Sequence, residues 1–434
     1  MNLARHLGLF SWAVAARAVQ LVYSLVFILF VIHNLPAAEF GRYVLVFQAY
    51  MFASLLNKTL ILNPMLRFAS DPDQFDSMSR NGFHSSLLFY ILCSLGLWLV
   101  APVISEMLRI EISDLRLAPL LMFAFFLRDF GFFIQQINYR TGRIFVIESI
   151  YFLGASAGIV YFALNDRLTD AIVVLNINIL AAALSSMFAL VYGFGGVRLF
   201  HLPDFTGVKK LLGYGFYGLP TGLYATMLTV ADSYIVGAIY TPAQVGVYNA
   251  AKQIYRVISV ITQAAALLLV PYSAKLTASK RSSDIKALFE KSTGYVFISM
   301  SIIAVFGWLI SVWFYKFYLA AEYIQAMPLL RLMLLAAPFE AIFNVIGAIL
   351  YGYGRVGIVN RVAITCVVMF SILLFPAAYL FSGTGAAASL VIALVITGVW
   401  IFISASREFG SGLDSTIRRI ILNIRGVFRK GISS

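Results

Sequence analysis

Ten charged residues interrupt long apolar stretches of the sequence, where charges are rare. They are Arg17, Lys58, Arg128, Asp129, Glu148, Asp232, Lys252, Arg256, Arg331 and Glu340. At the centre of a lipid-facing helix each would cost roughly 2.5 to 3.5 kcal/mol, so they must pair with one another or line a wet cavity. Six are cations and four are acids. Because the excess is positive, this interior suits a ligand that carries negative charge.

Lys252 and Arg256 stand four residues apart and share one face of a helix, where like charges repel. An anionic group is therefore expected opposite them. It is either a carboxylate such as Asp232 on the preceding helix or the phosphates of a ligand, which arginine holds with two hydrogen bonds. Arg17 and Arg128 lie near the middle of their apolar runs and could supply further cations. We predict that Arg17, Arg128, Lys252 and Arg256 bind an anionic ligand such as a diphosphate.

Asp129, Asp232 and Glu340 are candidates for ion coupling or for pairing with a cation. A buried carboxylate that alternates between protonated and ion-paired states can link a conformational change to a proton gradient. Asp129 and Glu340 follow the matching segments that begin at Pro119 and Pro328, by ten and twelve residues. This spacing predicts similar depths in the membrane for the two acids.

The other buried charges have simpler interpretations. Arg128 and Asp129 are adjacent and so about 100° apart around a helix, which we expect to prevent full mutual neutralisation. Glu148 lies nearer a helix end and is interpreted as an ion-pair partner. Lys58 and Arg331 also lie near helix ends, where a long side chain either reaches the membrane surface or lines a lumen.

The elements that carry these charges are predicted to be membrane-spanning helices. Of 434 residues, 61% are hydrophobic and 12% are charged, against roughly 25% charged in an ordinary soluble domain. A spanning helix needs about 20 mostly apolar residues, and the runs here are continuous rather than alternating, which excludes a barrel. The predicted spans are 8–32, 43–66, 83–105, 117–138, 144–164, 171–194, 211–238, 246–273, 294–314, 325–351, 357–381 and 385–405. The predicted fold class is an all-α polytopic membrane protein of about twelve helices.

The connections between these spans are too short to hold a soluble domain. The two cysteines, Cys93 and Cys366, stand singly in apolar runs, without the spacing of a metal site or a disulfide framework. The four histidines are scattered at the ends of spans. We therefore expect packing roles for both cysteines, and no metal, cofactor or catalytic centre.

Lysine and arginine set the orientation of such a protein in the membrane. With a cytoplasmic N-terminus, 21 of the 32 basic residues fall on the cytoplasmic side and 5 on the opposite side. Both termini are therefore predicted to be cytoplasmic. The net charge of +13 reflects this asymmetry and attraction to anionic lipid, and no nucleic-acid partner is expected.

The C-terminal segment 407–434 is basic and has the pattern of a helix lying among lipid headgroups. Its apolar residues at helical spacing are Ile417, Ile420, Ile421, Ile424 and Phe428, and its basic residues on the other side are Arg418, Arg419, Arg425 and Arg429. We interpret this tail as an orienting anchor, with a regulatory role as the alternative.

Three pairs of matching segments indicate an internal duplication. The pairs are Glu39-Phe40-Gly41-Arg42-Tyr43 with Gln244-Val245-Gly246-Val247-Tyr248, Pro64 with Pro271, and Tyr139-Arg140-Thr141-Gly142-Arg143 with Tyr351-Gly352-Tyr353-Gly354-Arg355. Each copy has six helices, so both enter the membrane from the same side and are related by an axis along the membrane normal. We predict two parallel six-helix lobes, 1–206 and 207–406, around a central cavity.

Glycine and proline crowd the first half of the seventh span. The residues are Gly213, Gly215, Gly218, Pro220 and Gly222. Because both residue types lower helix stiffness, Gly218 and Pro220 are predicted to form a hinge for movement of the lobes. Close helix packing through small residues is the alternative explanation.

Segments of both copies resemble a known family. They are GYGFYGLP from Gly213, ADSYIVG from Ala231 and PAQVGVYNAAK from Pro242 in the second copy, and LPAAEFGRY from Leu35 in the first. They resemble Wzx-type polysaccharide flippases of the multidrug/oligosaccharidyl-lipid/polysaccharide exporter superfamily. This resemblance implies flipping of an undecaprenyl-diphosphate-linked oligosaccharide to the periplasmic leaflet of a bacterial inner membrane, for O-antigen, capsule or exopolysaccharide assembly. We also expect a monomer that works beside polysaccharide polymerase and chain-length proteins.

Two other classes of protein remain open. A multidrug or small-molecule exporter would share the fold, but acids should dominate its cavity, whereas cations prevail here. A membrane glycosyltransferase or polymerase would need a catalytic carboxylate or histidine cluster on a sizeable loop. The sequence therefore favours a flippase that is not an enzyme and that works by ion-coupled alternating access.

Overall fold

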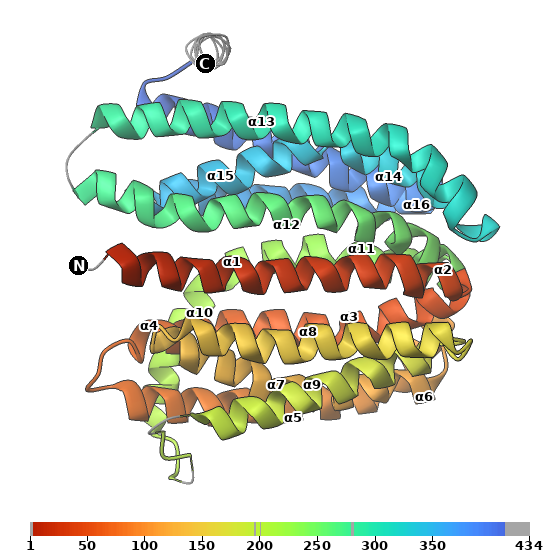
Figure 1. Cartoon of the computed structure of the whole chain (residues 1–434), viewed down its shortest axis with the longest axis horizontal. Coiled ribbons are helices and arrows are strands. Elements are labelled where there is room, and N and C mark those ends of the chain that lie inside the picture. Colours follow the sequence, from red (N-terminus) through yellow and green to blue (C-terminus); the bar gives the residue numbers. More distant parts are fainter. Residues whose placement is uncertain (1–2, 195–196, 200, 279–281, 413–434) are drawn as a thin grey trace. The chain divides into compact units, whose positions relative to one another are not determined.

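The computed structural model describes residues 3–194, 197–199, 201–278 and 282–412, and all of its regular elements in these ranges are helices (Figure 1). The chain divides into two compact units. Unit 1 comprises Met1–Ala250 with Tyr318–Ile324, and unit 2 comprises Ala251–Phe317 with Gln325–Ser434. These units do not test the predicted division into lobes 1–206 and 207–406, which stays a prediction. The amphipathic pattern of the tail lies outside the described residues.

Unit 1 holds the elements from the N-terminus to the beginning of α12. They are α1 (Leu3–Val26), the π-helical turn η1 (Phe27–Val31), α2 (Ile32–Asn34), α3 (Ala37–Asn57), the π-helical turn η2 (Lys58–Leu62), α4 (Asn63–Phe68), α5 (Phe75–Leu108), α6 (Ile112–Leu115), α7 (Leu117–Ile137), α8 (Thr141–Leu164), α9 (Ala171–Gly193), α10 (Phe205–Thr226), the π-helical turn η3 (Met227–Ala231) and α11 (Asp232–Ile239). Helix α12 (Pro242–Ala278) begins in this unit and continues into unit 2.

Unit 2 is built from the rest of α12 and the helices that follow it. They are α13 (Ser282–Trp313), most of the π-helical turn η4 (Phe314–Tyr318), α14 (Ala326–Leu334), α15 (Ala337–Tyr353) and α16 (Val356–Phe409). The short 3-10 turn η5 (Ala321–Gln325) lies mostly in unit 1. Within unit 2, α15 packs against α13 and α16.

Each of the twelve predicted spans falls on a helix or a run of helices in the structure. Among the described residues, nine helical stretches are long and apolar enough to cross a membrane, or ten when the bent pair α14 and α15 counts as one. One of these stretches, α16, carries two predicted spans, because its backbone is non-helical at Ser382 (φ 57°, ψ −141°). The predicted span 246–273 lies in α12, which is not among the nine. The structure confirms an all-α polytopic membrane protein.

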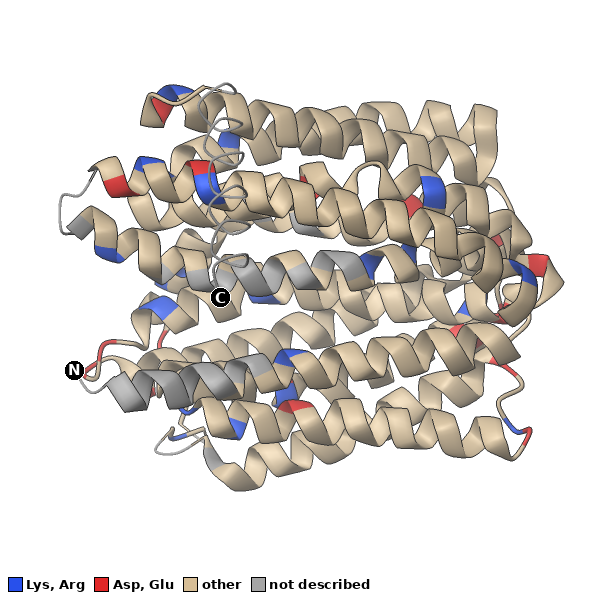
Figure 2. Ribbon diagram, turned by 45° about the horizontal axis from the view of Figure 1, so that its top comes forward, with Lys and Arg blue, Asp and Glu red and all other residues tan. Residues whose placement is uncertain are grey.

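Helix α7 is the central helix of unit 1, because it packs against α3, α5, α8 and α9. Its Leu121 and Phe130 are fully buried, whereas Leu99 and Val103 on α5 are 71% and 69% exposed. Exposed leucine and valine in such numbers are expected where lipid covers the surface. Most charged positions lie near the ends of the helices (Figure 2). The polar residues of α7 are therefore exceptions that need partners.

The first pair of repeated segments meets in space within unit 1. A Cβ atom on Gly41 of α3 would lie 1.8 Å from the carbonyl oxygen of Pro242, and one on Gly246 of α12 would lie 1.9 Å from that of Ala37. Each glycine thus touches the residue four positions before the other glycine. This reciprocal contact is what a pseudo-twofold axis through the crossing would produce, and it supports the duplication.

The third pair of repeated segments forms equivalent turns, but in a different register. In the first turn, Tyr139 N–H donates to Gln136 and Arg140 N–H to Gln135; in the second, Gly354 N–H donates to Tyr351 and Arg355 N–H to Leu350. The hydrogen bonds therefore match Arg140 with Arg355, an offset of 215 residues. The identical Tyr-x-x-Gly-Arg letters, at an offset of 212, are three residues out of the structural register.

Replacing either crossing glycine by alanine should destabilise the protein, because a methyl group has no room against main-chain oxygen. We expect Gly41→Ala and Gly246→Ala each to lower the free energy of unfolding by about 1 to 3 kcal/mol. Gly96→Ala is the matched control, since a Cβ there has open space around it. Thermal unfolding in detergent measures the effect, and equal melting temperatures for all three variants would contradict the close crossing.

Candidate functional site

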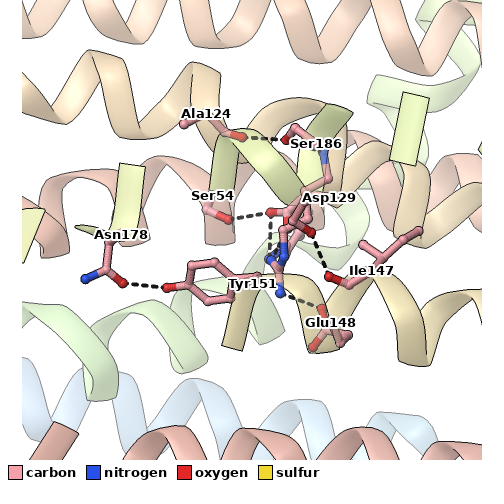
Figure 3. Close-up of polar contacts among 11 residues, drawn as sticks. Ser54, Ala124, Asp129, Ile147, Glu148, Tyr151, Asn178 and Ser186 are labelled. Carbon is pink, nitrogen blue, oxygen red and sulfur yellow. Dashed lines mark hydrogen bonds and ion pairs between the residues drawn. The ribbon is translucent and has the colours of Figure 1, made fainter. Parts of the chain in front are cut away.

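Four of the charged residues form one buried charge cluster on three segments of unit 1 (Figure 3). Arg128 of α7 donates from Nη1 to Asp129 Oδ1 at 3.1 Å and from Nη2 to Glu148 Oε1 on α8 at 2.5 Å. Lys58, at the start of η2, places Nζ 2.9 Å from Asp129 Oδ2. Two cations and two carboxylates give the buried charge cluster no net formal charge.

Arg128 and Asp129 form an ion pair, but each also has a second partner, Glu148 for Arg128 and Lys58 for Asp129, in agreement with the expectation that the two do not fully neutralise each other. The two residues leave the helix in different directions, but the long arginine side chain bends back to reach the neighbouring carboxylate. The interpretation of Glu148 as an ion-pair partner is confirmed. Lys58 is 34% exposed, and its amino group pairs with Asp129.

Aromatic rings surround the Arg128 guanidinium. Its central carbon lies 4.6 Å from the ring centroid of Tyr151, 5.4 Å from that of Phe125 and 5.6 Å from that of Phe152. The negative faces of aromatic rings attract a cation, and this attraction is strongest where water is excluded. The arginine is thus held by two carboxylates and by three rings. Its side chain is only 8% exposed.

A second layer of hydrogen bonds fixes the residues that contact the buried charge cluster. The hydroxyl groups of Tyr151 and Tyr23 both donate to Asn178 Oδ1, at 2.8 and 2.9 Å. Ser54 Oγ donates to Asp129 Oδ2 at 3.2 Å. The Arg128 main-chain N–H donates to Ser186 Oγ at 2.9 Å. These bonds connect α1, α3 and α9 to the cluster. Together with α7, α8 and η2, which carry the charged residues, these helices fix its geometry.

The π-helical turn η2 links the buried charge cluster to the glycine-rich helix α10. A Cβ on Gly215 would lie 2.1 Å from the Leu60 carbonyl oxygen, and one on Gly222 would lie 2.3 Å from Thr59 Oγ1. Close packing therefore explains these two glycines. It does not explain Gly218, where a Cβ would have ordinary contact with Thr59 at 4.0 Å. Single π-helical turns within α-helices occur often at functional sites.

The predicted hinge at Gly218 and Pro220 lies inside α10. Pro220 removes a main-chain donor from that helix, and the π-helical turn η3 begins seven residues later, so this stretch has fewer regular helical hydrogen bonds. These features agree with a flexible point. The hinge itself stays a prediction.

Asp232 is fully buried in unit 1, away from any exposed surface. Its Oδ2 accepts a hydrogen bond of 2.6 Å from the Tyr248 hydroxyl, and its Oδ1 accepts one of 2.8 Å from the Ser233 main-chain N–H. Tyr248 is the tyrosine of the repeated segment on α12. At the corresponding place of the first copy, Tyr43 contacts Phe27, with ring centroids 5.4 Å apart. At the offset of 205 residues that matches Tyr248 with Tyr43, Asp232 matches Phe27. The Asp232–Tyr248 hydrogen bond of the second copy therefore corresponds to the Phe27–Tyr43 ring contact of the first.

The remaining predicted site residues lie on α1, α12 and α15. Arg17 is partly buried and donates from Nη1 to Gln20 Oε1 at 2.8 Å. On α12, Lys252 is buried and Arg256 is partly buried. Glu340 of α15 accepts a hydrogen bond from the Tyr255 hydroxyl. Their predicted roles toward a diphosphate or an ion stay predictions.

The register of the turns places Asn344, rather than Glu340, at the position of Asp129 in the other copy. The expectation of similar depth for Asp129 and Glu340 counted residues from Pro119 and Pro328. Between Pro328 and Glu340 the chain bends by 46°, with two residues in the break between α14 and α15, and this break changes the register of the residues that follow. By the same offset Arg128 matches Phe343 and Glu148 matches Ala363. Three of the four residues of the buried charge cluster therefore have uncharged counterparts in the second copy.

Comparisons with known proteins agree with this architecture. Residues 34–328 match a family model described as polysaccharide biosynthesis protein. Among solved structures, the chain is similar to the lipid II flippase MurJ in an inward closed conformation (TM-score 0.74, 12% identity, covering 98% of this chain and 92% of that one). It is also similar to an inward-facing multidrug resistance MATE family transporter of the MOP superfamily (TM-score 0.70, 12% identity, covering 90% and 94%).

A third similar structure is a MOP superfamily transporter from Pyrococcus furiosus, described as having a binding pocket of reverse polarity (TM-score 0.64, 14% identity, covering 93% and 94%). No curated protein sequence matches the chain.

The chain therefore has the fold shared by that flippase and that MATE transporter. The family model covers more than half of the chain, so the protein belongs to the polysaccharide biosynthesis protein family. The resemblance drawn from the repeated segments is thereby confirmed. The description of this family gives the coarse function, a part in polysaccharide biosynthesis.

Arg128→Gln should destabilise the protein by about 3 to 5 kcal/mol, because it leaves Glu148 buried without its cation. Glu148→Gln should also be destabilising. The double variant should lose less than the sum of the two, with a coupling energy of about 0.5 to 3 kcal/mol. Equilibrium unfolding of the purified variants measures the cycle.

Arg140→Gln serves as the control for this cycle, because Arg140 is exposed at the start of α8 and outside the buried charge cluster. Its unfolding free energy should equal that of the unaltered protein. If the Arg128 and Glu148 substitutions prove strictly additive, the ion pair between them contributes nothing to stability.

Proposed function

We propose that the protein flips an undecaprenyl-diphosphate-linked oligosaccharide from the cytoplasmic to the periplasmic leaflet of a bacterial inner membrane. The family match and the fold shared with a lipid II flippase support this assignment. The observation that carries the substrate class is the distribution of buried charge. Two cations and two acids cancel in the buried charge cluster, so the positive excess belongs to the other spanning helices.

In this proposal the diphosphate binds to the cations outside the cluster, Arg17, Lys252 and Arg256. A diphosphate supplies the negative charge that Lys252 and Arg256 need on their shared helix face. Arg128 is paired in the present state and could join them only after Asp129 or Glu148 releases it. The ligand would occupy a central cavity between lobes 1–206 and 207–406, with both termini cytoplasmic.

Protonation of Asp129 is the proposed coupling step. A neutral carboxylic acid no longer holds Lys58 or Arg128 as an ion pair, so both cations lose a partner. Because Lys58 begins η2, and Thr59 and Leu60 pack on the glycines of α10, the change would reach the hinge at Gly218 and Pro220. Asp232 and Glu340, which accept hydrogen bonds from tyrosines, are further candidates for ion coupling or pairing.

The protein is proposed to act as a monomer beside polysaccharide polymerase and chain-length proteins, without a cofactor and without catalysis. A multidrug or small-molecule exporter is the second candidate function, because MATE transporters have a similar fold. The positive excess disfavours it, since cationic drugs need an acidic cavity. The membrane glycosyltransferase or polymerase alternative has no supporting cluster of catalytic groups among the described residues.

Flipping can be measured with the protein reconstituted in proteoliposomes that contain a labelled undecaprenyl-diphosphate oligosaccharide. Lys252→Gln and Arg256→Gln should each slow flipping about tenfold or more, since each removes a charged contact with the diphosphate of about 1.5 to 3 kcal/mol. Arg140→Gln should leave the rate unchanged. Unaltered flipping in both correctly inserted variants would remove these residues from the site, and no flipping by the unaltered protein would refute the proposed function.

Asp129→Asn should abolish the effect of a pH gradient on the flipping rate without abolishing flipping itself, because asparagine keeps the shape of the side chain but cannot bind and release a proton. We expect the unaltered protein to accelerate when a pH gradient is imposed, and the Asp129→Asn variant to run at one rate with or without the gradient. Asp166→Asn is the control, since Asp166 is exposed and its positive φ of 54° suits asparagine. A gradient response that survives in Asp129→Asn would assign coupling elsewhere.

A further inference from the structure

A groove on the surface of unit 2 follows the second half of α16 toward its C-terminal end. Its apolar part is lined by Val395, Ile396 and Val399. Its polar end is lined by Arg361, Ser404 and Arg407, and Trp400 lies between the two parts. We refer to this surface as the α16 groove. One end of it is therefore suited to hydrocarbon and the other to a charged group.

The polar end of the α16 groove has an excess of positive charge. Its one carboxylate, Glu408, accepts a hydrogen bond of 2.7 Å from Arg355 Nε and is thereby neutralised. Arg361 donates from Nε only to the Gly357 carbonyl oxygen, at 3.3 Å. Arg407 has no ion pair with the part of the chain that the structure describes, and both Arg361 and Arg407 are exposed. Two guanidinium groups are thus available to an anion.

The length of the α16 groove fits one leaflet of a bilayer. Val395 and Arg407 are twelve residues apart on the helix, which is about 18 Å at 1.5 Å per residue. Half of a hydrocarbon core of about 30 Å is about 15 Å. Arg407 lies at the end of α16 that precedes the basic tail, and Arg361, near the beginning of α16, lines the same polar end. The positive-inside rule puts both arginines at the cytoplasmic headgroups.

Trp400 is consistent with this depth, because tryptophan prefers the boundary between headgroups and hydrocarbon. It is 39% exposed. Val399 is adjacent to Trp400, and Val395 and Ile396 lie about one turn deeper, where an acyl chain would run. A basic pocket between spanning helices on the cytoplasmic side is a known arrangement for binding anionic headgroups.

We propose that the α16 groove binds an anionic glycerophospholipid of the cytoplasmic leaflet. Arg361 and Arg407 hold the headgroup phosphate, and an acyl chain lies along Val395, Ile396 and Val399. A zwitterionic lipid carries a compensating cation that two arginines repel. An undecaprenyl chain is far longer than one leaflet, so the matched length favours a phospholipid over the proposed substrate of the transporter.

Fluorescence of Trp400 tests the proposal directly. The full chain carries four other tryptophans, Trp12, Trp98, Trp308 and Trp313, which are replaced by phenylalanine so that emission comes from Trp400 alone. The protein is reconstituted in phosphatidylcholine vesicles, and either phosphatidylglycerol or phosphatidylcholine with brominated acyl chains is added as the quencher. Phosphatidylglycerol should quench at a much lower mole fraction than phosphatidylcholine.

Arg361→Gln and Arg407→Gln should each raise the mole fraction of phosphatidylglycerol needed for half quenching by about fivefold, since one basic residue near the surface contributes about that factor. Arg140→Gln, an exposed arginine outside the groove, should leave it unchanged. Equal emission of all variants in unbrominated vesicles shows that the site is folded.

Three results would overturn the proposal. The first is equal quenching by the two lipids, and the second is an unchanged response in both groove variants. The third is displacement of brominated phosphatidylglycerol by small amounts of undecaprenyl diphosphate, which would assign the α16 groove to the transported lipid.

Discussion

An arginine inside a membrane helix must have its charge and hydrogen bonds satisfied by the protein, and Arg128 imposes this constraint on unit 1. The residue lies on α7, which packs against α3, α5, α8 and α9. Two carboxylates neutralise it and three rings cover it, while Lys58 balances the second carboxylate. Tyr151, Asn178 and Tyr23 then hold these partners in place. A neutral cluster tolerates burial, but each of its members depends on the others.

Hydropathy, charge bias and short repeats predicted the class of fold, because the cost of charge and unpaired main chain in lipid leaves few alternatives. The site was only partly predictable. Asp129 and Arg128 were named, but the role of Lys58 was left open between the membrane surface and a lumen, because a span end estimated from hydropathy does not reveal a π-helical turn. Glu340 was matched with Asp129 because sequence letters do not show the bend between α14 and α15. The geometry of the ion pairs depends on such local departures from a regular helix, and the hydrophobic periodicity of the sequence does not reveal them.

The duplicated chain has kept its packing contacts and changed its chemistry. The glycines at the crossing of α3 and α12 occur in both copies, since any side chain there would strike main chain. Three charged residues of the cluster, Arg128, Asp129 and Glu148, do not, because Phe343, Asn344 and Ala363 occupy the matching positions. The proposed coupling step at Asp129 therefore has no ionic counterpart in the second copy.

The glycine crossing also has a mechanical meaning. Helices that interlock through side chains resist rotation, because each ridge must leave its groove before the next can enter. At Gly41 and Gly246 the contact is between bare main chains, with no rotamers to rearrange. Two helices in contact only through main chain can change their crossing angle without moving side chains past one another. The glycine crossing therefore fixes the distance between α3 and α12 but offers little resistance to rotation.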